Sequence, residues 1–283
     1  MHWTNVKTAC PVGRCLNHRH TENATLRFGR FQRVLFAGDS MAGQLYAAFK
    51  CNAERFKWTS KQQTNMPRLP LPRLFWDWQA ISFGWMNFYS RASLANMTSE
   101  HEIGAPRRFK SHPDLLIVCF GAWYREPQYV GKTKNSEPRQ WLFEQHLAEA
   151  VAHLEEICRS ELVVCVLATT SAKHFRGTGT FSEAVVDRCG REVNSTSRPR
   201  SACGTKAEAA AGNAWHVNAA RRAVHAAQRV RLFDFFKPTL EWHDLHPGYQ
   251  ENYHGARCDC HHFCYRADRW EGLLHELAAA SAV

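Results

Sequence analysis

Short, continuous apolar runs alternate along the chain with amphipathic stretches. Four runs have the character of strands buried on both faces: Val34 to Ala37, Leu115 to Phe120, Leu162 to Ala168 and Val230 to Phe235. The clearest helical pattern spans Gln140 to Arg159, where apolar side chains recur on one face. Weaker helical patterns cover roughly Ala42 to Phe49, Gly212 to Gln228 and Trp270 to Ala280.

Strands that alternate with helices in this way predict an α/β fold, with a central parallel sheet covered by helices on both sides. In such sheets, ligands bind beyond the carboxyl ends of the strands. The residues that follow the first three runs are Gly38 to Ser40, Gly121 to Trp123 and Thr169 to Ser171. Candidate chemistry is therefore expected there.

Two stretches do not fit the alternating pattern. Lys61 to Phe88 is rich in Pro and Trp, and Gly177 to Thr205 is rich in Gly, Ser, Arg and Asn, so both are predicted to be long loops or lids. Residues 1–30, with Cys10 and Cys15, are predicted to form an irregular lead-in tied down by disulfides. Residues 31–283 are then expected to form one domain.

Composition narrows the classes of partner. A chain of 283 residues with 45% hydrophobic residues supports a sizeable core, and no apolar run is long enough for a predicted membrane span. The net charge of +10 suggests affinity for anions, but the basic residues are scattered and no nucleic-acid motif is present. A solvated basic surface is the simpler interpretation, and no nucleic-acid partner is predicted.

Cysteine content and glycosylation sequons bear on the compartment. The chain has 11 cysteines and carries Asn-x-Ser/Thr sequons at Asn23, Asn96 and Asn194. Both features favour the lumen of the secretory pathway, because disulfides persist in oxidising compartments. The expected location is that lumen, with the Golgi favoured, although the first residues lack a secretory signal and the cytosol stays open as the alternative.

The segment from Arg33 to Leu45 reads as a strand, a tight turn and the start of a helix, with Ser40 at the turn. A serine there has an exposed hydroxyl, and the helix N-terminus can direct N–H groups at an oxyanion. Catalysis is one interpretation. The other is that Asp39 or Ser40 simply caps the helix, since both residue types do so readily.

A second candidate lies near the C-terminus, between Cys258 and Cys264. Serine needs a base to become a nucleophile, and a histidine oriented by a carboxylate supplies one. Asp259 and His262 are three residues apart, so a single turn can present both to one site. The same segment also resembles a zinc cluster, because it holds three cysteines and two histidines.

Taken together, these blocks resemble the PC-esterase family of SGNH-like acyl enzymes, whose plant members are the trichome birefringence-like polysaccharide O-acetyltransferases. The blocks occur in the family's order from Arg33 to the C-terminus. They are Gly38-Asp39-Ser40, Gly121-Ala122-Trp123-Tyr124, Thr169 to Phe175, Asp244-Leu245-His246-Pro247 and Asp259-Cys260-x-His262-x-Cys264. The resemblance implies an SGNH-like three-layer sandwich.

By that resemblance, Ser40 is the nucleophile, His262 the general base and Asp259 its orienting acid. The oxyanion hole would use the Ser40 amide with Gly84 or Gly121. Residues expected to bind substrate are Trp123, His174, Asp244 and His246. The chain departs from the family at Gly43-Gln44, where Arg-Asn is typical, and at Ala122, where His is typical. These departures bear on the oxyanion donors and on acceptor specificity.

The resulting hypothesis is an enzyme that moves an acyl group, with acetyl favoured, to or from a carbohydrate hydroxyl through an acyl-serine intermediate. No bound cofactor and no metal are predicted; the acyl donor is a co-substrate and a glycan is the acceptor. A carbohydrate esterase, a decayed glycan-binding protein and a zinc-stabilised interaction module are the alternatives. At least one of Cys258, Cys260 and Cys264 is expected in a disulfide that holds Asp259 and His262 in place.

Overall fold

The computed structural model describes residues 31, 33–62, 75–80, 114–122, 124, 140–160, 163–176, 203–246, 248–252 and 255–282. The predicted lead-in over residues 1–30, the sequons and most of the loop predicted over Gly177 to Thr205 lie outside these residues. Within the described part, no helix is both long enough and apolar enough to span a membrane.

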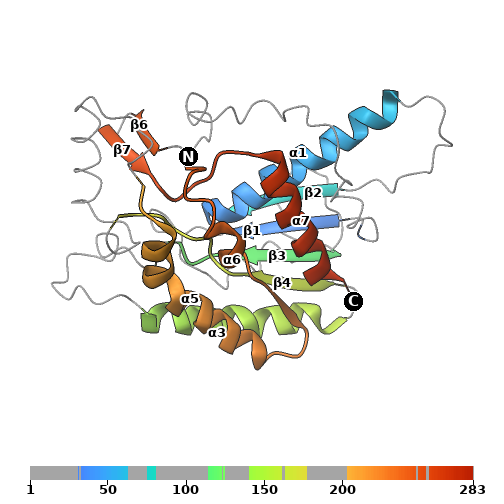
Figure 1. Cartoon of the computed structure of the whole chain (residues 1–283). Helices are drawn as coiled ribbons and strands as arrows, with labels where there is room; N and C mark the ends of the chain where they lie inside the picture. The colour runs from blue at the N-terminus through green and yellow to red at the C-terminus, as the bar shows by residue number, and fades with distance from the viewer. Residues whose placement is uncertain are drawn as a thin grey trace.

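A five-stranded parallel sheet forms the centre of the molecule (Figure 1). Its strands are β1 (Arg33–Gly38), β2 (Phe75–Ala80), β3 (Leu115–Cys119), β4 (Val164–Ala168) and β5 (Val230–Phe233). They lie in the order β2-β1-β3-β4-β5, and every neighbouring pair is parallel. The α/β class predicted from the sequence is therefore confirmed, and the four predicted strands all belong to this sheet.

Strand β2 corrects one prediction, because it lies inside the stretch Lys61 to Phe88 that was expected to be a loop. The reason lies in its place at the edge of the sheet, next to β1 alone. An edge strand needs no continuous apolar run, and the sequence of β2, Phe-Trp-Asp-Trp-Gln-Ala, contains two polar residues. Such a strand lacks the apolar signature that marked its neighbours.

Within the described ranges, the strands are followed or connected by five helices and one short 3-10 turn: α1 (Ser40–Gln62), α3 (Gln140–Ile157), η5 (Cys158–Ser160), α5 (Lys206–His225), α6 (Phe236–Thr239) and α7 (Ala267–Ser281). The predicted helices are all present, but α1 and α5 are longer than expected. Helix α5 begins early because Thr205 and Glu208 form a capping box, in which each side chain binds the other residue's backbone N–H.

Side chains alternate between the two faces of the sheet, and each face meets a different pair of helices. Val34 and Phe36 of β1 pack in a cluster with residues of α1 and α7. Leu35 and Ala37 of the same strand pack in another cluster, with residues of α3 and α5. The helices therefore form layers on both sides of the sheet, as Figure 1 also shows.

A small antiparallel hairpin of β6 (Gly248–Asn252) and β7 (Gly255–Asp259) lies outside the main sheet (Figure 1). The sequence analysis did not predict it. Its strands read Gly-Tyr-Gln-Glu-Asn and Gly-Ala-Arg-Cys-Asp, which lack the apolar alternation that signals a half-buried strand. The hairpin matters for the site because β7 ends at Asp259.

Candidate active site

Ser40 stands where the sequence places it, at the first residue of α1 directly after β1. The turn requires Gly38, whose φ of +148° is one that L side chains rarely adopt. A Cβ at this position would also collide with the carbonyl oxygen of Cys119 in β3. The backbone of Asp39 is tied to the same strand, because its N–H donates to the Cys119 carbonyl over 3.1 Å. The backbone that carries Ser40 is thus fixed directly to the sheet.

The structure brings Ser40, His262 and Asp259 together across most of the chain. The Ser40 Oγ lies 3.0 Å from Nε2 of His262, although the two residues are 222 positions apart. Nδ1 of His262 lies 2.8 Å from Oδ2 of Asp259. A carboxylate, an imidazole and a hydroxyl in this order form the hydrogen-bonded chain that activates a serine nucleophile.

Asp259 also orders the backbone of the turn that carries the histidine. Its Oδ1 accepts from the backbone N–H groups of His261, over 3.1 Å, and His262, over 2.9 Å. Burial opposes the ionised form of this carboxyl group, but the charge and hydrogen bonds of His262 outweigh burial and hold the pKa of Asp259 below its usual range. The carboxylate is therefore ionised, which suits a group that orients an imidazole.

The protonation behaviour of His262 follows from the same contacts. Burial favours its neutral form, but the charge of Asp259 and the hydrogen bond to it outweigh burial, so the pKa of His262 is raised above the usual histidine value. A raised pKa makes the imidazole a stronger proton acceptor. It also means that the imidazole becomes neutral, and able to accept the Ser40 proton, only as the pH rises.

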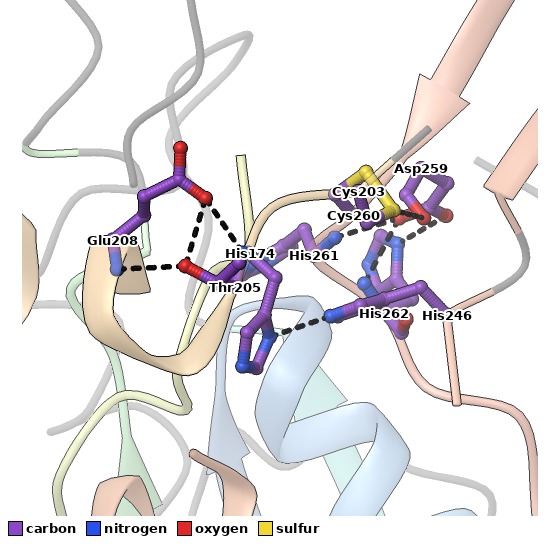
Figure 2. Close-up of a disulfide and its surroundings, with 9 residues drawn as sticks. All are labelled: His174, Cys203, Thr205, Glu208, His246, Asp259, Cys260, His261 and His262. Carbon is purple, nitrogen blue, oxygen red and sulfur yellow. Dashed lines mark hydrogen bonds and ion pairs between the residues drawn. A yellow bond between two sulfur atoms is a disulfide. The ribbon is translucent and has the colours of Figure 1, made fainter. Parts of the chain in front are cut away.

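The turn that carries His262 is held by a disulfide, as the sequence analysis expected for at least one of its cysteines. Cys260 is bonded to Cys203, which lies just before α5, and Figure 2 shows this bond beside Asp259 and His262. The partner therefore comes from the C-terminal half of the chain and not from the region of Ser40. Cys264 is also disulfide-bonded, as is Cys51, and the side chain of Cys258 lies outside the described residues.

Gln44 is a site residue that the sequence analysis noted only as a departure from the resembled family. It lies one turn after Ser40 in α1, and its side-chain amide binds the backbone of Phe263 in both directions. Gln44 Nε2 donates to the Phe263 carbonyl over 3.1 Å, and the Phe263 N–H donates to Gln44 Oε1 over 3.2 Å. Two hydrogen bonds therefore join helix α1, which carries Ser40, to the segment that carries His262.

His174 and His246 lie next to the site and contact each other (Figure 2). Nδ1 of His174 is 2.7 Å from Nε2 of His246, Nδ1 of His246 is 2.7 Å from the His262 carbonyl, and Nε2 of His174 is 3.0 Å from the Leu240 carbonyl. Three such contacts need three N–H protons, whereas a neutral pair carries two. Burial lowers the pKa of both histidines, that of His246 to about 3, and so opposes the third proton that these contacts would share.

The remaining predicted site residues divide into four cases. Both ring nitrogens of His174 and of His246 face protein atoms, and their predicted substrate contact stays a prediction. Asp244 is exposed beside His174. Trp123 and Gly84 lie outside the described residues. Gly121, a predicted oxyanion donor, has a φ of +122° and lies two residues after the carboxyl end of β3, which is the strand next to β1.

Several contacts in the structure bear on the zinc interpretation of the C-terminal segment. Cys260 is committed to its disulfide, and the two ring nitrogens of His262 face Asp259 and Ser40. Among the residues that the structure describes, no group of three or more His, Cys, Asp or Glu side chains is arranged to hold a metal ion.

In comparisons with known proteins, no family model and no curated sequence matches the chain.

Proposed function

We propose that this protein is a serine-dependent acyl enzyme that moves an acyl group, with acetyl favoured, to or from a carbohydrate hydroxyl. The observation that carries the proposal is the hydrogen-bonded chain from Ser40 through His262 to Asp259, with contacts of 3.0 and 2.8 Å. The helix-cap interpretation of Ser40 does not account for these contacts, because a capping serine binds backbone N–H groups of its own helix and needs no distant histidine.

The proposed reaction has two halves that use the same groups. In the first, His262 Nε2 takes the Ser40 proton while Oγ bonds to the acyl carbon, and His262 then returns that proton to the departing alcohol or other leaving group. In the second, an acceptor hydroxyl or water gives its proton to His262 and bonds to the acyl carbon. The bond between the acyl carbon and Ser40 Oγ then breaks, and His262 returns the proton to Oγ, which restores the free serine. Asp259 stays ionised throughout and stabilises the imidazolium in each half.

The fold supports placing the protein with the SGNH-like acyl enzymes that its sequence blocks resemble. The strand order β2-β1-β3-β4-β5, the nucleophile directly after β1 and the Asp-His turn shortly before the last helix suit that three-layer arrangement. The carbohydrate acceptor and the preference for transfer rest on the resemblance to the trichome birefringence-like O-acetyltransferases. The disulfides favour the secretory lumen as the place of action.

The experiment that tests the proposal follows where the acyl group goes. The protein is incubated with a chromogenic acetyl ester, with and without oligosaccharides. The products are separated and compared with those of a matched Ser40→Ala sample. Acetylated sugar supports the transferase, and acetate alone supports an esterase. Glycan binding without any Ser40-dependent turnover would favour the decayed binding protein, and one equivalent of zinc bound to the Cys258 to Cys264 segment would overturn the catalytic assignment.

A further inference from the structure

Lys173 is a buried lysine that the proposed triad does not use. Its side chain is only 1% exposed, in the segment that follows β4. Burying an ammonium group is costly unless opposite charge and hydrogen-bond acceptors surround it. The groups that surround the Lys173 ammonium therefore indicate what it does in the candidate site.

The Lys173 ammonium group and the Asp39 carboxylate hold the loop after β3 from two directions. Lys173 Nζ donates to the carbonyl oxygen of Ala122. Asp39 Oδ2 accepts from the N–H of the same residue over 3.0 Å. Two successive peptide groups, one on each side of the Ala122 Cα, are therefore fixed by opposite charges.

Asp39 links this loop to the nucleophile. While its Oδ2 binds Ala122, its Oδ1 accepts from the N–H of Met41 over 2.9 Å, in the first turn of α1. Ser40 lies between Asp39 and Met41 in the chain, and Gly121 directly precedes Ala122. The two backbone regions predicted to supply oxyanion donors are thus joined by one carboxylate, and Lys173 completes the clamp.

The segment that carries Lys173 is itself fixed on three sides. The N–H of Ala172 donates to Thr239 Oγ1 over 2.9 Å, and the N–H of His174 donates to the Cys260 carbonyl over 2.9 Å. The carbonyl of Lys173 accepts from Asn213 Nδ2 over 3.5 Å. The ammonium group is consequently delivered from a backbone that cannot easily shift, as a positioning role requires.

We propose that Lys173 is a positioning residue of the acyl-transfer reaction, which holds the Gly121–Ala122 loop beside Ser40 and supplies a fixed positive charge to the base machinery. The inference rests on the proposed function. The charge has a second effect, because Lys173 opposes the protonated form of His262 and thereby limits the rise in its pKa. Burial raises the pKa of Asp39, and the N–H groups of Met41 and Ala122 act against that rise together with the charge of Lys173.

Three variants separate position from charge. Lys173→Met removes the donor and the charge, Lys173→Gln keeps a donor for the Ala122 carbonyl without the charge, and Lys237→Met removes one exposed lysine from α6 as the control. For Lys173→Met we expect kcat for ester turnover to fall by on the order of a hundredfold with KM little changed, because a small misplacement of reacting groups costs that much. Lys173→Gln should recover part of kcat.

The charge is read by titration of His262, followed by NMR of protein labelled with ¹⁵N at histidine. Both Lys173 variants should move the His262 midpoint to higher pH, and Lys237→Met should not. A midpoint unchanged in folded Lys173→Met and Lys173→Gln protein would overturn the inference. This measurement needs no turnover, so it stands even if wild-type protein transfers no acyl group, a result that would sink the proposed function instead.

Wild-type protein provides a test that does not depend on the variants folding. If the clamp holds, the Ala122 amide hydrogen exchanges with solvent as slowly as the amides of β3, since Asp39 binds it in a buried site. Exchange at the rate of an exposed amide would show that the loop is not held, and the positioning role of Lys173 would fall with it.

Discussion

The two halves of the candidate site are held in place by different means. Ser40 is positioned by regular structure, because a strand, a glycine turn and a helix N-terminus determine its backbone. His262 lies in an irregular segment between β7 and α7, where no ladder of backbone hydrogen bonds exists. Side chains and a covalent bond replace that ladder: Asp259 and Gln44 bind the backbone of the turn, and Cys260 is tied to Cys203.

The comparison teaches where each half is vulnerable. The nucleophile depends on a few backbone requirements, and outside them its own side chain contributes little to the fold. The base depends on several distant side chains, each of which can be removed singly. Substitutions around Ser40 should therefore change either activity or stability, but not both. Substitutions around His262 should each lower activity by part of the full loss.

The largest effect is expected on the Ser40 side. Ser40→Ala should abolish Ser40-dependent turnover, a loss of several orders of magnitude, and leave the melting temperature almost unchanged, because a small side chain at a turn is removed. Gly38→Ala, its structural counterpart, should lower the melting temperature sharply, since the added Cβ meets the Cys119 carbonyl. More than about a tenth of wild-type turnover in Ser40→Ala would contradict the nucleophile assignment.

On the other side, His262→Ala should come close to the loss in Ser40→Ala, and His261→Ala should lose far less. The two rings are neighbours with centroids 4.8 Å apart, but only His262 contacts Ser40 and Asp259 through its ring. In wild type, kcat/KM should rise with pH through a midpoint above that of an ordinary histidine, because the base must be neutral. Equal losses in the two variants would mean that the histidine is misassigned.

Loss of the Cys203–Cys260 disulfide should be intermediate in effect. It closes a loop with a sequence separation of 57 residues, and the chain-entropy model assigns such a loop about 4 kcal/mol of stability. The double Cys→Ser variant should lose both melting temperature and kcat. Replacing Cys158 and Cys165, whose bond lies near the start of β4 and away from the triad, should lower stability less and leave kcat unchanged.

The smallest effect on kcat is expected from loss of the Gln44–Phe263 hydrogen bonds, which join α1 to the segment that carries His262. Gln44→Ala leaves the N–H and carbonyl of buried Phe263 without their partner, at a cost of about 1 to 3 kcal/mol for each unsatisfied group. Steady-state kinetics should show kcat lowered by about tenfold with KM unchanged. Gln145→Ala, on the exposed face of α3, is the matched control, and a Gln44 variant that behaves like it would show that these hydrogen bonds do not position His262.

Sequence reasoning found the parts of the molecule that carry a local signal. The inner strands β1, β3 and β4 are marked by continuous apolar runs, and the edge strand β5 by a short run that Arg231 interrupts. The spacing of Asp259 and His262 indicates a shared site, and their roles come from the resemblance to a family motif. Gln44 and Lys173 carry no such signal, because each acts on a backbone group far away in the chain; Gln44 and Phe263 are 219 positions apart. Only the fold shows that a glutamine in a helix and a lysine after a strand reach the same site.

The ring closed by Cys203 and Cys260 encloses α5, β5, α6, β6 and β7. A protease that cuts one peptide bond anywhere inside this ring produces two fragments that stay covalently joined. His262, which lies two residues after Cys260, remains attached to the segment before α5 after such a cut. A cut inside this ring therefore leaves His262, the proposed base, covalently joined to the fragment that holds Ser40.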